Sequence, residues 1–177
     1  MSYITTYTGI KINPKEPHIN NIEIKDIAHA LSLICRGNGH VSTFFSVAQH
    51  CINCAQEAKE RGYNKKIILA CLLHDASEAY LSDVPRPLKQ DIKDYINIEN
   101  NLLDIIYTKY LGSPLSYDEQ AIIKMIDDDM LYYDLKYLLN ETLDKDEPII
   151  HITLNYDFIT FQEIEKTYLE LFHTYSK

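Results

Sequence analysis

Residues 65–80 constrain the fold of this chain more than any other stretch. They are dense in Ile, Leu, Ala and Cys, which predicts a helix that is buried on most of its faces. His74 and Asp75 directly follow Leu72 and Leu73 in this apolar stretch. Because an ionisable side chain is rarely buried unless it is paired or binds a metal, neighbouring elements must supply partners for both residues.

Hydrophobic periodicity predicts that helices make up most of the chain. The first helix begins near Lys25, carries Ile27, Leu31 and Ile34 at helical spacing, and ends before Gly37. Further helices are expected over residues 43–61, 65–80, 94–111, 118–139 and 160–174.

The remaining segments are expected to form loops and a small amount of β structure. Residues 3–24 mix β-branched residues with Pro, Gly and Asn, which predicts an irregular arm with a short hairpin. Residues 82–87 contain two prolines and cannot continue a helix. Residues 149–155 favour a short strand that pairs with the N-terminal arm. The expected fold is mostly α: one domain over residues 1–177, with a helical core at about 25–139 and small β additions near both termini.

Composition and charge disfavour several classes of function. The formal net charge of -9 disfavours binding to a nucleic acid polymer. No apolar run approaches the length of a membrane span, and the first residues lack both parts of a secretory signal. A cytoplasmic protein with no membrane or nucleic acid partner is therefore expected. The cysteines lie in apolar helical stretches, which indicates reduced, buried thiols: Cys35, Cys51, Cys54 and Cys71. The C-x-x-C spacing within this set has no second pair in the chain, so we interpret it as core packing.

Imidazoles and carboxylates on three successive expected helices form the candidate site. His50 lies in the helix at 43–61, His74 and Asp75 lie late in the next helix, and Asp127 to Asp129 lie inside the helix at 118–139. Two imidazoles and two carboxylates are a mixed nitrogen and oxygen ligand set that suits Mn, Fe, Co, Ni or Zn. Taken singly, each part has a simpler explanation. A lone helical histidine is more often a core or surface residue, and the run of aspartates is a solvated face from which one member turns inward.

The order of these residues resembles the HD-domain phosphohydrolases, a family named for its paired His and Asp. The similarity extends to Ser-Val-Ala-Gln-His at 46–50, His-Asp-Ala-Ser-Glu at 74–78 and Asp-Val-Pro-Arg-Pro at 83–87. These segments look like those of the small HD-domain 5′-deoxynucleotidases, and the same scaffold is similar to certain phage-type deoxynucleoside triphosphate hydrolases. The resemblance covers roughly residues 26–139.

The resemblance implies a role for each matching residue. One divalent metal ion (Mn, Co, Fe, Ni, Zn or Mg) would be held by His50, His74, Asp75 and Asp127. Glu78 would position or deprotonate the attacking water, or protonate the leaving oxygen. Asp83 would accept a hydrogen bond from a sugar hydroxyl. The phosphate contacts would be Arg36, Lys89 and Lys124.

Two positions near the implied phosphate contacts leave questions open. His40 follows Gly39 in an expected loop near Arg36, where it is either a further phosphate contact or proton donor, or a surface histidine. The deoxynucleotidase pattern has a tryptophan directly after the arginine, whereas Gly37 stands here and the chain has no Trp. The groups that recognise sugar and base therefore do not follow from the resemblance.

The expected function is release of phosphate from (deoxy)nucleoside 5′-monophosphates by metal-activated water. Alternatives within the same chemistry are a triphosphohydrolase that acts on dNTPs and a cyclic-nucleotide phosphodiesterase. An alternative of another class is a catalytically silent module that binds nucleotides. The expected partners are a small nucleotide substrate and, by resemblance, further copies of the chain in a homodimer or higher homo-oligomer.

Overall fold

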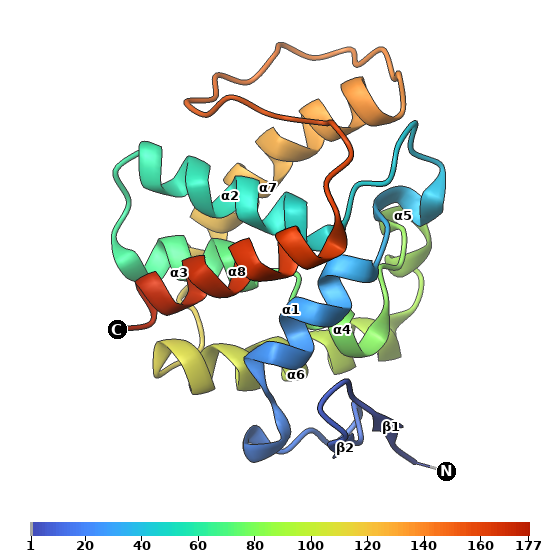
Figure 1. Cartoon of the computed structure of the whole chain (residues 1–177), viewed down its shortest axis with the longest axis vertical. Helices are drawn as coiled ribbons and strands as arrows, with labels where there is room; N and C mark the ends of the chain where they lie inside the picture. Colours follow the sequence, from blue (N-terminus) through green and yellow to red (C-terminus); the bar gives the residue numbers. More distant parts are fainter. Residues whose placement is uncertain (1) are drawn as a thin grey trace.

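The computed structural model describes residues 2–177 and confirms a mostly helical fold with a small amount of β structure (Figure 1). Two short strands, β1 (Ile4–Thr5) and β2 (Lys11–Ile12), pair antiparallel and form the hairpin expected in the N-terminal arm. The longer helices are α1 (Ile24–Leu33), α2 (Val47–Glu60), α3 (Lys65–Leu73), α6 (Lys93–Leu111), α7 (Tyr117–Leu138) and α8 (Phe161–Tyr175). The shorter ones are α4 (Glu78–Leu81), α5 (Arg86–Lys89) and the 3₁₀ turns η1 (Ile19–Asn21) and η2 (Arg36–Gly39).

Side-chain caps fix where α2, α7 and α8 begin. In each helix, a Ser or Thr side chain accepts a hydrogen bond from the backbone N–H three residues later. The side chain of that later residue accepts a hydrogen bond from the backbone N–H of the Ser or Thr. The Ser-x-x-Glu spacing before α7 predicts this cap, and the structure confirms it. Because Ser46 caps α2, this helix begins at Val47 and not at residue 43 as the periodicity suggests. The cap thereby places His50 in the first turn of α2.

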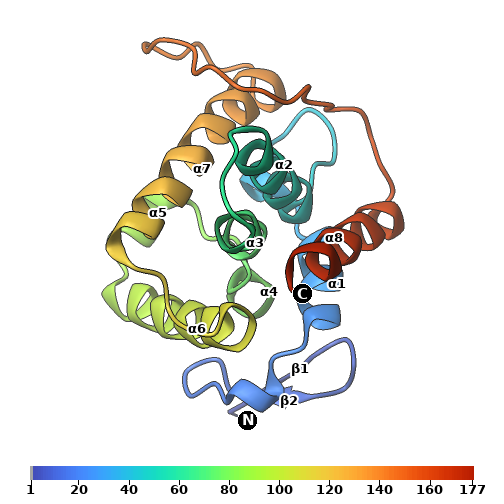
Figure 2. The same cartoon turned by 90° about the vertical axis from the view of Figure 1, so that its left-hand side faces the viewer.

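Helix α3 lies at the centre of the molecule, with α2, α6, α7 and α8 around it (Figure 2). Its residues from 67 to 73 are all buried, as the composition predicts. Helix α8 adds Ile164, Tyr168 and Phe172 to the same core, and the Tyr168 hydroxyl donates to the Leu72 carbonyl at 2.7 Å. The helical core therefore extends past residue 139 to the last helix. No helix within residues 2–177 is both long and apolar enough to cross a membrane.

Helix α3 is shorter than expected, because it ends at Leu73 and not near residue 80. The His74 ring Nδ1 contacts the Cys71 carbonyl at 2.7 Å, close to where a continuing helix would place a backbone N–H. The chain then makes tighter turns, with the Ala76 N–H bonded to Leu73 and the Glu78 N–H bonded to Asp75. Glu78 therefore begins a separate helix, α4, and does not lie on the same helix as His74.

The connector between α7 and α8, residues 139–160, contains no strand, so the expectation of a strand at 149–155 is wrong. The reason is that Glu57, buried in α2, binds its backbone instead. The Glu57 carboxylate accepts hydrogen bonds from the N–H groups of His151 and Ile152 at 2.8 and 3.1 Å. It also contacts the His151 ring at 2.9 Å. A side chain thus satisfies backbone donors that would otherwise pair in a sheet.

Candidate functional site

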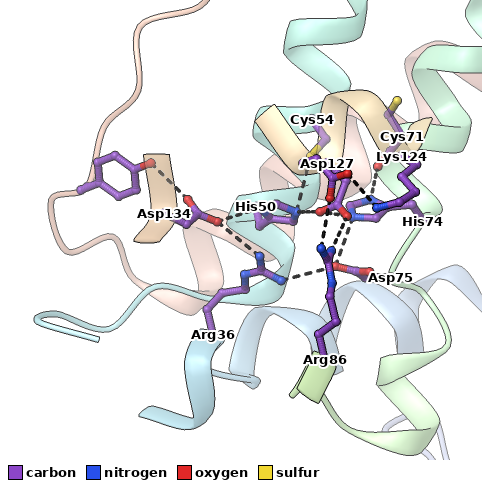
Figure 3. Close-up of polar contacts among 12 residues, drawn as sticks. Arg36, His50, Cys54, Cys71, His74, Asp75, Arg86, Lys124, Asp127 and Asp134 are labelled. Carbon is purple, nitrogen blue, oxygen red and sulfur yellow. Dashed lines mark hydrogen bonds and ion pairs between the residues drawn. The ribbon is translucent and has the colours of Figure 1, made fainter. Parts of the chain in front are cut away.

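Four residues from three helices meet at the candidate site (Figure 3). His50 comes from α2, His74 and Asp75 follow the end of α3, and Asp127 lies midway along α7. The Nε2 atom of His50 is 3.0 Å from Asp127 Oδ1, which is also 3.7 Å from His74 Nε2. Asp75 Oδ2 is 3.2 Å from His74 Nε2. The four predicted metal ligands therefore form one contact cluster, in which His74 Nε2 lies near both carboxylates.

The outer ring nitrogens of both histidines are already engaged. His50 Nδ1 donates to Asp134 Oδ2 at 2.8 Å, and His74 Nδ1 donates to the Cys71 carbonyl at 2.7 Å. The carbonyl can only accept, so Nδ1 of His74 carries the proton and Nε2 faces the site. His74 Nε2 is buried and forms no hydrogen bond. Metal-binding histidines are commonly oriented in this way, with the second nitrogen held by a carboxylate or a carbonyl.

Charge compensation within the cluster shifts the pKa of each member. Burial opposes ionisation of Asp75, but the His74 imidazole beside it lowers the pKa of Asp75 to about 2. Burial likewise opposes ionisation of Asp127, yet the hydrogen bond from His50 and the charge of the nearby His74 imidazole hold its pKa well below the usual range. Both carboxylates are therefore ionised at neutral pH, as metal ligands must be. A divalent cation that binds here would displace protons from the imidazoles.

Arg36 lies beside this cluster in the short turn η2. Its guanidinium is 3.6 Å from Asp75 Oδ2 and 3.4 Å from Asp134 Oδ2 (Figure 3). The side chain is 13% exposed, and neighbouring carboxylates, Asp134 first among them, raise its pKa against the effect of burial. A fixed, buried guanidinium next to candidate metal ligands is suited to bind a phosphate oxygen.

A cavity of about 210 Å³ opens in front of these residues. Asp75, Asp127 and Arg36 line it, together with Glu78 and Asp83. The Glu78 Oε2 atom is buried without a hydrogen-bond partner, and burial, with Asp75 and Asp83 nearby, raises the pKa of Glu78 well above its usual range. Burial also raises the pKa of Asp83. The cavity thus contains a carboxyl group that readily keeps a proton.

The other residues expected to contact phosphate, Lys89, Lys124 and His40, differ in their distance from this cavity. Lys89 lines the cavity, although its Nζ atom also binds Glu99 at 2.7 Å. Lys124 is 64% exposed and pairs with Asp128 at 2.7 Å, outside the lining of this cavity. His40 is exposed and does not line the cavity either. The structure therefore brings Lys89 to this cavity, whereas Lys124 lines a second cavity together with His74 and Asp127, and His40 lines neither.

The chain is similar to two known proteins. It is 38% identical to YfdR of Escherichia coli over 128 residues, which are 70% of this chain and 69% of YfdR. The chain belongs to the YfdR family. It is also 33% identical over 109 residues to a protein of Rhodobacter capsulatus, which covers 58% of this chain and 55% of that protein. Both relatives are described as uncharacterized proteins. No protein-family model matches the chain.

Two further residues contact the candidate site in this member of the YfdR family and were not predicted as site residues from the sequence. Asp134 accepts hydrogen bonds from His50, from Arg36 and from the Tyr156 hydroxyl at 3.1 Å. It stands seven residues after Asp127, on the same face of α7, and this spacing could have indicated it. Arg86 reaches from α5 to within 3.3 Å of Asp127 Oδ2 (Figure 3). It lies in the Asp-Val-Pro-Arg-Pro segment that carries the family resemblance, although that resemblance gave Arg86 no role.

The two cysteines of the C-x-x-C spacing are buried core residues that also border the cluster. Cys54 Sγ lies 3.6 Å from His50 Nε2. Two sets of side chains have ligand atoms close enough to hold a metal ion: His50, Cys54 and His74, and Cys51, His74 and Asp75. Burial raises the pKa of the Cys51 thiol, which therefore keeps its proton at neutral pH. The structure thus contains buried His, Cys and Asp groups that could bind a metal.

Proposed function

We propose that this protein is a metal-dependent phosphohydrolase of the HD-domain superfamily that releases phosphate from small nucleoside 5′-monophosphates. One observation carries the proposal. Two histidines, each held by its outer nitrogen, and two ionised carboxylates form one contact cluster beside a buried arginine. A structural role for such a cluster is less favoured, because burying charged groups costs free energy even when they are paired.

The donor set fits one divalent metal ion. His50, His74, Asp75 and Asp127 would hold it, and the unpartnered Nε2 atom of His74 supports this assignment. When bound, such an ion lowers the pKa of water and polarises a phosphoryl oxygen. The mixed nitrogen and oxygen donors suit Mn, Fe, Co, Ni or Zn. Cys54, beside His50, adds a soft atom near the site and favours the softer members of that series.

The chain's own side chains would bind the substrate and move the proton. Arg36 would bind the phosphate oxygens, since its guanidinium is fixed between Asp75 and Asp134, and Lys89 would add a second positive charge. Glu78 would hold a proton on Oε2 and deliver it to the leaving oxygen, which fits its buried, unpartnered carboxyl group.

Two cavities border the candidate ligands: the one beside Arg36 favours a monophosphate by its size, and a second of about 570 Å³ is lined by His74 and Asp127. Sites that enclose a drug-sized ligand typically have about 300–1,000 Å³, and the cavity beside Arg36 has about 210 Å³. A compact substrate, or one that is partly exposed, fits this volume better than a nucleoside triphosphate enclosed as a whole.

A turnover screen tests the proposal directly. The purified protein, stripped with a chelator, is given Mn, Co, Mg or Zn in turn. Each form is assayed with nucleoside monophosphates, deoxynucleoside monophosphates and dNTPs, with phosphate and triphosphate measured as separate products. We expect metal-dependent phosphate release from monophosphates. Release of triphosphate from dNTPs would replace the proposal with a triphosphohydrolase. The absence of turnover despite bound metal would favour a binding module.

Substitution of Glu78 separates catalysis from metal binding. We expect Glu78→Gln to keep the metal and to lose about 100-fold or more of the turnover rate, the usual range for a lost proton donor. Metal content by elemental analysis and kcat are measured on the same preparation. An unchanged kcat with full metal content would remove Glu78 from the mechanism.

A further inference from the structure

The cavity beside Arg36 continues from the candidate metal ligands along an apolar face of α7. Leucines follow Asp127 on the same helix face at spacings of three and four residues, and one more leucine ends the helix. This leucine face comprises Leu131, Leu135, Leu138 and Leu139, all of which line the cavity. From Asp127 to Leu138 the helix rises by about 16 Å at 1.5 Å per residue. A phosphate at the Asp127 end would therefore leave most of this wall uncovered.

The leucine face does not belong to the main hydrophobic core. Within the part of the chain that the structure describes, Ile126 and Met130 of α7 pack into that core, whereas none of the four leucines does. Leu131, Leu135 and Leu139 are half-buried, and Leu138 is buried. Burial of apolar surface stabilises the fold only where the surface leaves water. The partly exposed leucines thus keep apolar surface available to a ligand.

The loop after Arg36 forms another part of the cavity wall, next to the end of α7. Gly37, Asn38 and Val41 line it, and the Ser42 N–H holds the loop to α7 by a 2.8 Å hydrogen bond to the Leu138 carbonyl. Gly37 has a φ of +58°, and a Cβ atom added there would lie 3.8 Å from a Leu139 methyl group. The same Cβ atom would lie 3.5 Å from a Val41 methyl group, so the loop packs closely against the Leu139 end of the leucine face and leaves the stretch from Leu131 to Leu135 for a ligand.

The two ends of the cavity differ in chemistry. The end at Asp127 has charged side chains, including Arg36 and Lys89, whereas the end at the leucine face offers a single side-chain amide, Asn38. Asp134 also lines the cavity, but its carboxylate is occupied by His50, Arg36 and Tyr156. Few groups remain that could recognise the edge of a base by hydrogen bonds. The leucine face can recognise a flat ring by its apolar surface alone.

We propose that the leucine face binds the organic part of the phosphate ester, a flat ring such as a nucleobase or an aryl group, through its face. This inference rests on the proposed function and adds the substrate class. Hydrophobic pockets discriminate weakly between ligands of similar shape. The protein therefore accepts purine, pyrimidine and simple aryl monophosphates, and disfavours phosphate esters without a ring.

A substrate series on the wild-type protein tests the inference without any variant. Phenyl phosphate, AMP, CMP and glycerol phosphate are compared by kcat/KM with the same metal. We expect the three ring-bearing esters to agree within about 10-fold of one another, and glycerol phosphate to fall about 10-fold or more below them. Equal kcat/KM for glycerol phosphate would overturn the inference and leave the phosphohydrolase in place. A strict preference for one base would overturn it as well.

Ligand binding without turnover keeps the two proposals distinguishable. Adenosine and cytidine lack phosphate, and their binding to the chelator-treated protein is measured by calorimetry. We expect both to bind, and Leu135→Asn to weaken both by about 10-fold, since a polar group then faces an apolar ring. Met125→Asn is the matched control, because Met125 lies exposed on α7 and lines no described pocket. Nucleoside binding without phosphatase activity would overturn the proposed function alone. No nucleoside binding, or equal loss in both variants, would overturn the leucine face.

Discussion

The candidate metal ligands and the cations at the cavity edge are held in opposite ways. His50 is fully buried, and both of its ring nitrogens contact carboxylates. At the edge, Arg86 is 51% exposed and binds Asp127 and Asp128, while Lys124 is 64% exposed and binds Asp128 alone. The ligands are thus fixed by the folded core, whereas the edge cations form ion pairs that water reaches.

The buried candidate ligands are held in place before any ligand binds, whereas the exposed cations can exchange one partner for another. Removing one member of a buried, hydrogen-bonded charge pair leaves an unpaired charge in the core, which is strongly destabilising. Exposed pairs contribute only about 0–1 kcal/mol, so Arg86 can leave its aspartates for a phosphate at little cost. In the proposed enzyme the core would position the metal, and the edge would be free to adapt to the substrate.

The largest effect is expected from Asp127→Ala, and Asp128→Ala is its matched control, for which we expect a smaller loss. These neighbours on α7 differ in direction, since Asp127 faces both histidines and Asp128 faces the edge cations. Asp127→Ala should weaken metal affinity by more than the roughly 100-fold upper range for residues that only orient a ligand. Metal titration and phosphate release measure both variants, with circular dichroism as the folding control. Similar losses in the two variants would contradict the assignment of Asp127.

An intermediate effect is expected from Asp134, which touches no candidate ligand atom of the metal but orients His50. Asp134→Asn should weaken metal affinity by about 10–100-fold, the usual range for such a partner. Tyr156→Phe removes one hydrogen bond to Asp134 and should have a smaller effect in the same direction. Tyr137→Phe is the control, because Tyr137 packs against Tyr156 without a hydrogen bond to Asp134. If Asp134→Asn kept full metal affinity, Asp134 would not act through His50. A change in kcat with no change in metal affinity would lead to the same conclusion.

The smallest effects are expected at the edge. Arg86→Ala should raise KM by several-fold with little change in kcat, since an exposed charge contributes about 1 kcal/mol or less. Lys124→Ala should have a smaller effect, because Lys124 does not reach Asp127. Both effects should decrease as salt is added, since exposed charges are screened. Steady-state kinetics at low and high ionic strength checks this. A loss of kcat in Arg86→Ala that salt leaves unchanged would place Arg86 with the buried cluster instead.

The sequence predicted the buried cluster better than the edge, and for a physical reason. His50 and Asp127 lie in α2 and α7, and His74 and Asp75 directly follow α3, so each residue's approximate place followed from the helices that the sequence predicts. The metal role of these residues came from resemblance, and no comparison with known proteins tests it. The positions of Lys124 and His40 depend on which exposed partner a flexible side chain meets, and periodicity does not encode that.

Two errors of secondary structure share one cause. The early end of α3 and the missing strand at 149–155 both arise where a side chain takes a place normally held by the backbone. His74 contacts the Cys71 carbonyl, and Glu57 binds the N–H groups of His151 and Ile152. Propensity and alternation describe backbone preferences, so neither could reveal these side-chain bonds. The position of Asp134 was missed for a related reason, because one of its partners, Tyr156, comes from the irregular connector.

The hydrogen bonds from His151 and Ile152 to Glu57 attach the connector to α2 and divide it into two parts, which differ in how well they tolerate inserted or deleted residues. Residues 139–150 lead from α7 to the attachment, and only the end points of this part are needed at the site. Residues 152–156 run from the attachment to Tyr156, whose hydroxyl meets Asp134. Members of the family can therefore gain or lose residues in the first part while the site stays intact. In the second part, one inserted residue would shift Tyr156 by up to about 3.5 Å and remove its hydroxyl from the carboxylate that orients His50.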